Sequence, residues 1–124
     1  MDSLSKDFYV FDTVLNWFIG FILLFVPNFF QSIVLEFVFF PNLFLQIIGL
    51  GFIFYAISQN YFYKKPKLRN FLIFSIFLAL STITVLTYTL VVVKPPLKFF
   101  WLNIFWMLDL YMLVLVYIFY LELK

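Results

Sequence analysis

Asp109 is the residue of this sequence best placed to do chemistry, because it is an acidic side chain inside the apolar stretch FFWLNIFWMLDLYMLVLVYIFYLELK. A carboxylate within a membrane-spanning segment is costly, so it is expected to face protein or water rather than lipid. There it can bind a proton or a substrate, or it can join helices through hydrogen bonds. As a proton donor it could also serve an isomerase.

Other polar residues could share a site with Asp109. Asp12, Asn16 and Gly20 recur every four residues and form one stripe on a helix. We interpret Asp12 as lying nearer the membrane interface, where a carboxylate is inexpensive. No Lys or Arg lies deep enough to be a counter-ion for Asp109, so we expect it to be hydrogen-bonded to Asn16 or to hydroxyls of the third apolar stretch.

The third apolar stretch offers a second stripe, and further candidates lie elsewhere. If these faces converge, they form a polar seam that contains Asp109. Trp106 could line a pocket, although packing is the simpler interpretation. The remaining members of the predicted seam are Gln46, Ser81, Thr84 and Tyr88.

The sequence contains no His and no Cys. This excludes disulfides, thiolate nucleophiles, zinc sites of the usual kind and His-ligated haem. It also removes the commonest general base. We therefore expect no metal, no cofactor and no catalytic residue.

The composition indicates a membrane protein. Of the 124 residues, 66% are hydrophobic and 11% are charged, whereas a soluble domain carries about 25% charged residues. A membrane helix needs roughly 20 apolar residues. Stretches 8–26, 43–60, 70–93 and 99–121 qualify, and they predict a single transmembrane domain over 1–124, an all-α, up-and-down bundle of four transmembrane helices.

The prolines support these boundaries. Proline suits the first turn of a helix, where its missing N–H is not needed. Pro41, Pro66 and the Pro95-Pro96 pair each stand just before a predicted span, and Pro27 ends or kinks the first one.

The stretch 28–40 is apolar but too short to cross a membrane. As a helix it places Asn28, Gln31, Ser32 and Glu36 within an arc of roughly 140°. This pattern predicts an amphipathic helix that lies in the membrane interface. The alternative is that it extends the first span beyond Pro27.

The basic residues predict the orientation. The loop 61–69 contains Lys64, Lys65, Lys67 and Arg69, and four spans put both termini on its side. Because cytoplasmic loops are enriched in Lys and Arg, both termini are expected in the cytoplasm. The loop could attract anionic lipid head groups, although a topology signal accounts for it more simply.

Three segments resemble the DoxX-like family of small four-span membrane proteins. They are LNWFIGFILLFVPNFF, FLQIIGLGFIFYAIS followed by a basic loop, and FWMLDLYML. The resemblance implies matching positions at Gly20, Pro27, Gly49 and Asp109. The basic residue that such proteins often carry near the start of the first span is absent here. Membership implies a bacterial inner-membrane protein, mostly of unknown role, with some relatives linked to quinone-coupled oxidation.

Gly49 and Gly51 would let another helix approach closely, and Gly20 could meet them. The first hypothesis is a non-catalytic accessory or interaction subunit, in contact with the lipid bilayer and with other membrane subunits or copies of itself, and not with nucleic acid. The second is a small proton-coupled transporter that uses Asp109, with Asn16 and Gln46 along the path. The third is a lipid- or sterol-modifying isomerase, which ranks last because acid–base catalysis usually needs a partner.

Overall fold

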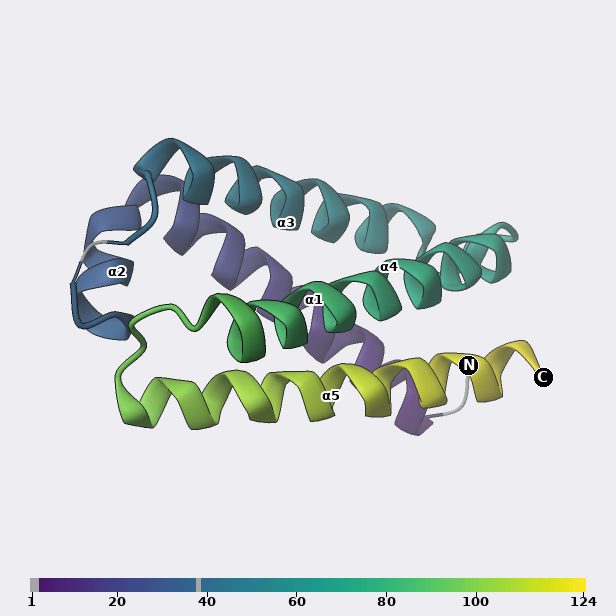
Figure 1. The fold of residues 1–124 in the computed structure, drawn as a ribbon. Helices are drawn as coiled ribbons and strands as arrows, with labels where there is room; N and C mark the ends of the chain where they lie inside the picture. The colour runs from purple at the N-terminus through teal and green to yellow at the C-terminus, as the bar shows by residue number, and fades with distance from the viewer. Residues whose placement is uncertain (1–2, 38) are drawn as a thin grey trace.

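The computed structural model describes residues 3–37 and 39–124. Within these residues the chain forms only helices and short connections (Figure 1). Helices α1, α3, α5 and the continuous pair α4 and η1 are each long and apolar enough to cross a membrane. The protein is therefore an all-α, multi-pass membrane protein, as the composition predicts. The elements are α1 (Ser3–Phe25), α2 (Pro27–Val34), α3 (Asn42–Phe62), α4 (Leu68–Tyr88), the π-helix η1 (Thr89–Val93) and α5 (Phe99–Leu123).

Proline marks the helix boundaries as expected. Helix α1 ends at Phe25, and α2 begins at Pro27, whose missing N–H is not needed in a first turn. Pro41 is the N-cap of α3. Helix α1 begins earlier than predicted, at Ser3, because its first turns are packed into the bundle, with Tyr9 only 2% exposed.

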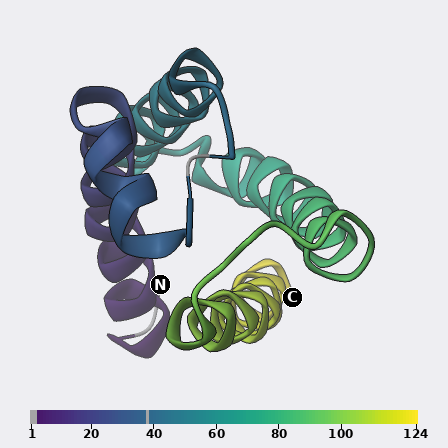
Figure 2. The same cartoon turned by 60° about the vertical axis from the view of Figure 1, so that its left-hand side comes forward.

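The long helices run up and down and occupy the corners of a bundle (Figure 2). Helix α1 packs along α3, and α4 packs along α5, with a smaller contact between α1 and α5. Both termini lie at one end together with the connection between α3 and α4, and α2 lies at the other end (Figure 1). The basic residues 64–69 therefore share an end with the termini.

Glycines bring α1 and α3 close together. A Cβ atom on Gly49 would lie 2.9 Å from the backbone oxygen of Gly20 and 2.9 Å from the backbone nitrogen of Leu24. Gly51 faces the outside of α3, where a Cβ would meet nothing within 4 Å. The close approach thus depends on Gly20 and Gly49 and not on Gly51.

The apolar core lies towards the end that carries the termini. It joins side chains from α1, α4 and α5, and Tyr55 and Phe62 of α3 pack against it. The Tyr9 ring stacks on Tyr63 with centroids 5.6 Å apart. The buried members of this core are Tyr9, Phe71, Leu72, Leu115, Ile118 and Phe119.

At the opposite end, α2 is shorter than the predicted helix 28–40 and ends at Val34. Gln31 was expected on the polar face, but it is fully buried. Its Oε1 accepts hydrogen bonds from the backbone N–H groups of Phe39 and Phe40, at 3.1 and 3.0 Å, and its Nε2 donates to the Phe40 carbonyl. This amide holds the chain in a turn and so ends the helix. Position 38 of the predicted helix lies outside the described residues.

The chain beyond α2 also pairs with the segment before α5. The Glu36 N–H donates to the Pro96 carbonyl at 2.7 Å, and the Lys98 N–H donates to the Val34 carbonyl at 3.0 Å. These bonds satisfy backbone groups that a continued helix would have satisfied internally. They tie the α2 end of the α1–α3 pair to the start of α5.

Candidate functional site

Asp12 is the centre of a buried polar cluster. Its side chain is 6% exposed. Oδ2 accepts hydrogen bonds from Gln59 Nε2 at 2.8 Å and from Asn16 Nδ2 at 3.2 Å, and Oδ1 accepts one from the Tyr111 hydroxyl at 3.2 Å. Helices α1, α3 and α5 therefore cover this carboxylate with protein, and its depth in the membrane, which the sequence places near the interface, stays a prediction.

Helix geometry brings these side chains together. Asp12 and Asn16 are four residues apart on one face of α1. Gln59 lies on the face of α3 that also presents Gly49 and the fully buried Ala56 to α1. Asn16 Nδ2 also donates to Gln59 Oε1 at 2.9 Å, so the Gln59 amide is bonded through both its nitrogen and its oxygen.

Aromatic side chains close the cluster on the side of the termini. The Tyr9 hydroxyl donates to the backbone carbonyl of Gln59, and Thr13 Oγ1 donates to the backbone carbonyl of Tyr9 at 2.9 Å. Because Tyr9 belongs to the apolar core, packing fixes the position of its hydroxyl. The polar cluster and the core therefore form one continuous block.

The groups bonded to Asp12 are amides and a phenol, which carry no formal charge. A buried carboxylate without a cation is costly unless hydrogen bonds satisfy its oxygens, as they do here. Among the described residues, no group of three or more acidic, His or Cys side chains could hold a metal ion. The cluster is suited to join helices or to exchange a proton.

Asp109 forms a separate site between α5 and α4. It is 5% exposed, and Thr87 Oγ1 donates a hydrogen bond of 2.8 Å to its Oδ2. Its Oδ1 is buried and has no hydrogen-bond partner within the described residues. Thr87 lies two residues before the start of the π-helix η1. Short π-helical segments are frequent at functional sites.

The hydrogen-bond partners that the sequence predicts for Asp109 are bonded to two different carboxylates in the structure. A hydroxyl of the third span does bond it, but this hydroxyl belongs to Thr87, whereas Asn16 bonds Asp12. Asp109 and Tyr111 are two residues apart and so point about 200° away from each other on α5. The carboxylates of Asp12 and Asp109 consequently face different helices, and the predicted single seam is two sites.

The remaining candidates lie elsewhere. Gln46 Nε2 donates to the Leu24 carbonyl at 3.2 Å, and this bond satisfies a backbone oxygen at the end of α1. Trp106 is 39% exposed and Tyr88 is 59% exposed. Ser81 and Thr84 are also exposed, so the predicted stripe of the third span faces away from the bundle.

Sequence reasoning missed Gln59, Tyr111 and Thr87. A signal for Gln59 was available, because it lies three residues after Ala56 on the face of the second span marked by small residues. Tyr111 and Thr87 carried no such signal, since aromatic and hydroxyl residues recur on every face of their helices.

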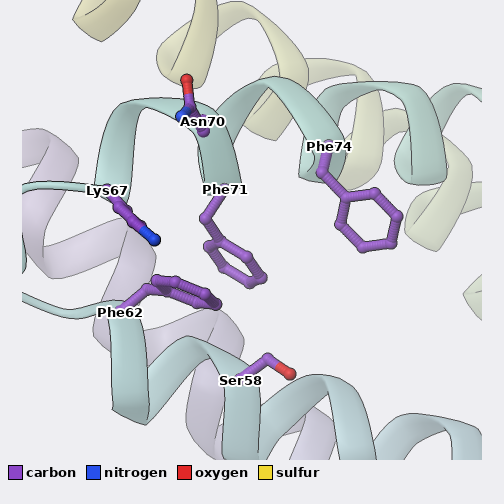
Figure 3. Close-up of a pocket in the computed structure, with 6 residues that line it drawn as sticks. All are labelled: Ser58, Phe62, Lys67, Asn70, Phe71 and Phe74. Atoms are coloured by element: carbon purple, nitrogen blue, oxygen red, sulfur yellow. The ribbon is translucent and has the colours of Figure 1, made fainter.

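Open grooves flank α3 without reaching either carboxylate. One, of about 320 Å³, lies between α3 and α4 and is lined by Ser58, Phe62, Lys67, Asn70, Phe71 and Phe74 (Figure 3). The other, of about 390 Å³, lies between α1 and α3. Its lining residues are Tyr9, Val10, Thr13, Val14, Trp17, Asn60 and Tyr63.

Comparison of the chain with protein-family models, with curated proteins and with solved structures gave no match. The resemblance to DoxX-like proteins therefore stays a prediction that rests on the sequence segments alone.

Proposed function

We propose that the protein is a non-catalytic accessory subunit of a membrane assembly, and that the outer face of α4 binds a transmembrane helix of another subunit. The observation that carries this proposal is the exposure of polar side chains at the centre of α4. Helices α1, α3 and α5 supply the scaffold that presents this face.

Helix α4 is the span that its own chain covers least. Only 6% of the residues in the most apolar part of the Leu68–Val93 span are buried, against 33% in α1 and 22% in both α3 and α5. Lipid can cover such a face, but a partner helix covers it equally well, because lipid tails are as apolar as leucine. Exposure alone therefore does not distinguish lipid from a partner helix, and the polarity of the exposed side chains has to decide.

The polarity of the exposed α4 face favours a partner helix. Ser81 lies at the middle of the Leu68–Val93 span, and Thr84 and Tyr88 follow it on the same face. Thr84 Oγ1 bonds the Leu80 carbonyl at 2.9 Å, which reduces its cost in lipid. The Ser81 hydroxyl has no such bond within the described residues. Small and hydroxyl-bearing residues are enriched where membrane helices meet.

The Asp12 cluster has a structural role in this proposal. It provides hydrogen bonds among α1, α3 and α5, each worth about 0.6 kcal/mol on average in a membrane protein. Such bonds hold the α1–α3 pair against α5 without any need for turnover.

The test compares the wild type with two variants in native membranes extracted with several mild detergents. Ser81→Phe adds bulk to the proposed interface, and Val14→Phe places the same aromatic side chain on the exposed face of α1, where Val14 is 61% exposed. Overpacking that costs about 1.4 kcal/mol lowers the affinity of an interface roughly tenfold. We expect Ser81→Phe to release a monomer and Val14→Phe to keep the assembly, as measured by native mass spectrometry.

A wild-type protein that is a lone monomer in every mild detergent would contradict the proposal. Equal behaviour of the two variants would also contradict it. A complex whose mass is a whole multiple of the chain mass of 15.0 kDa identifies the partner as another copy of this chain, whereas a mass that is not such a multiple identifies a different subunit.

The Oδ1 of Asp109 is buried and has no hydrogen-bond partner among residues 3–37 and 39–124, and this favours a second candidate, a small proton-coupled carrier. An intramembrane carboxylate with free acceptor capacity is suited to bind a proton. Asp109→Asn should then abolish proton flux into proteoliposomes while leaving the folded protein abundant. The matched control is Thr87→Val, which removes the hydrogen bond but keeps the carboxylate. Equal flux in wild type and Asp109→Asn would end this idea.

We also propose that the chain resides in a bacterial inner membrane with both termini in the cytoplasm. Six of its eight basic residues belong to the termini and to the connection between α3 and α4, which share one end. A reporter that is active only in the cytoplasm should be active when it is fused after Lys124. Activity of a periplasmic reporter at that position would reverse the assignment.

A further inference from the structure

The groove between α3 and α4 has aromatic walls and is open to the outside of the bundle. The rings of Phe62 and Phe71 stack at 4.9 Å with an interplanar angle of 19°, and Phe74 continues the wall along α4 (Figure 3). Phe71 is buried, whereas Phe74 is 56% exposed. A groove with these walls accepts a flexible apolar chain from the side of the lipid.

The connection between α3 and α4, which borders this groove, is basic. Residues 61–70 include four basic residues and no acidic one. Lys64 Nζ lies 5.4 Å from the centre of the Tyr63 ring, Lys65 Nζ lies 5.8 Å from the centre of the Tyr61 ring, and Arg69 donates to the Leu123 carbonyl at 2.8 Å.

Lys67 differs from these three neighbours. Within the described part of the chain its ammonium group contacts no hydrogen-bond acceptor, carboxylate or ring. Its side chain extends from the start of α4 towards the rings of Phe62 and Phe71 (Figure 3). The groove therefore combines an uncompensated positive charge with an apolar wall.

The order of the charge and the aromatic rings along α4 matches the order of the head group and the acyl chain in a phospholipid. Lys67 is the N-cap of α4 and lies at its membrane edge. Phe71 and Phe74 follow four and seven residues later, which places them about 6 and 10 Å deeper along the helix. The charge is thus level with a head group, and the aromatic walls are level with the upper part of an acyl chain. Asn70 also lines the groove, but its side chain points away from Lys67 (Figure 3), so Lys67 supplies the polar contact.

We propose that this groove binds one anionic phospholipid, with the phosphate at Lys67 and an acyl chain along Phe62, Phe71 and Phe74. A zwitterionic lipid would fill the apolar part equally well but would not neutralise Lys67. A soluble anion would meet the charge but leave the aromatic walls uncovered. The proposed partner helix would meet the same face of α4 at Ser81, about 10 Å beyond Phe74 along the helix axis, so the two proposals are tested by separate variants.

The experiment uses the full chain in nanodiscs that contain phosphatidylglycerol and phosphatidylcholine with identical acyl chains. Native mass spectrometry after release from the nanodisc counts the lipids that remain bound. We expect the wild type to retain one phosphatidylglycerol in preference to phosphatidylcholine. Lys67→Gln should lower that preference about fivefold, because a basic residue near an anionic lipid surface contributes about 1 kcal/mol.

Lys65→Gln is the matched control, because it removes the same charge from the same connection but outside the groove. It should change the preference by less than twofold. Equal loss in the two variants would show diffuse attraction to the basic connection and would overturn the site, as would full retention by Lys67→Gln. If Lys67→Gln does not fold, the wild-type preference measured at rising salt concentration decides, since a preference that is insensitive to salt refutes a charge-based site.

Discussion

The close approach of α1 and α3 gives a prediction with an internal control. Gly49→Ala and Gly51→Ala make the same chemical change two residues apart in the middle of α3. A methyl group at Gly49 would lie 2.9 Å from backbone atoms of Gly20 and Leu24 and 3.0 Å from Leu23 Cβ. Two of these atoms belong to the backbone of α1 and the Leu23 Cβ is attached directly to it, so they can move only if α1 moves. A methyl group at Gly51 would meet nothing within 4 Å.

Gly49→Ala and Gly51→Ala are expected to have the same effects on stability, apart from the contact that a methyl group at Gly49 makes with α1. Replacing glycine with alanine inside a helix is worth about 0.8–1 kcal/mol in intrinsic propensity, and this gain is equal at both positions. Overpacking typically costs about 1–3 kcal/mol. Gly51→Ala should therefore be more stable than the wild type by up to about 1 kcal/mol, and Gly49→Ala should be less stable than Gly51→Ala by about 1–3 kcal/mol.

The measurement is the unfolding free energy in mixed micelles, obtained by titration with a denaturing detergent and followed by tryptophan fluorescence. The difference between the variants isolates the helix contact, because propensity and the effects of the unfolded state cancel. Equal stability of Gly49→Ala and Gly51→Ala would refute the reasoning, since it would mean that α1 and α3 do not touch at Gly49.

Two further predictions concern buried amides. Gln59→Leu removes the amide that bonds the buried carboxylate and Asn16, and an unsatisfied buried group costs about 1–3 kcal/mol; the thermal midpoint in detergent should fall well below that of Asn60→Leu, whose site is exposed. Gln31→Leu leaves the backbone N–H groups of Phe39 and Phe40 without their acceptor, so hydrogen exchange at these two positions should accelerate while exchange within α3 stays unchanged; unchanged protection at both positions would contradict the role assigned to this amide.

The spans and their order could be predicted from the sequence because their causes are local. Hydrophobic length decides whether a segment can cross a bilayer, and proline decides where a helix can begin. The helix ends agree with the prolines for this reason, as at Pro27 and Pro41. The early start of α1 was missed because its first turns are held by tertiary packing at Tyr9 and not by local hydropathy.

The direction in which each helix faces could not be predicted. In water, the apolar face of a helix turns inward, but lipid tails are as apolar as leucine and remove that preference. A polar stripe can then face a neighbour inside the bundle or a partner outside it. Asp12 with Asn16 faces inward, whereas Ser81 with Tyr88 faces outward, although both stripes follow the periodicity of a single helix face. Only the packing of small residues such as Gly49 carries a usable signal.

The hydrogen bonds of the two buried carboxylates separate their roles. Both oxygens of Asp12 are bonded, and the donors come from α1, α3 and α5, so its replacement disturbs the contacts among three helices. In the part of the chain that the structure describes, Asp109 has one bonded oxygen and one oxygen without a hydrogen-bond partner, and its partner Thr87 lies on the neighbouring helix of the same pair. A fully bonded carboxylate stabilises the fold it is bonded to, whereas an open acceptor keeps the capacity to bind. The effects of Asp12 variants should therefore be seen in folding, and Asp109 is the position where a loss of activity can be separated from a loss of structure.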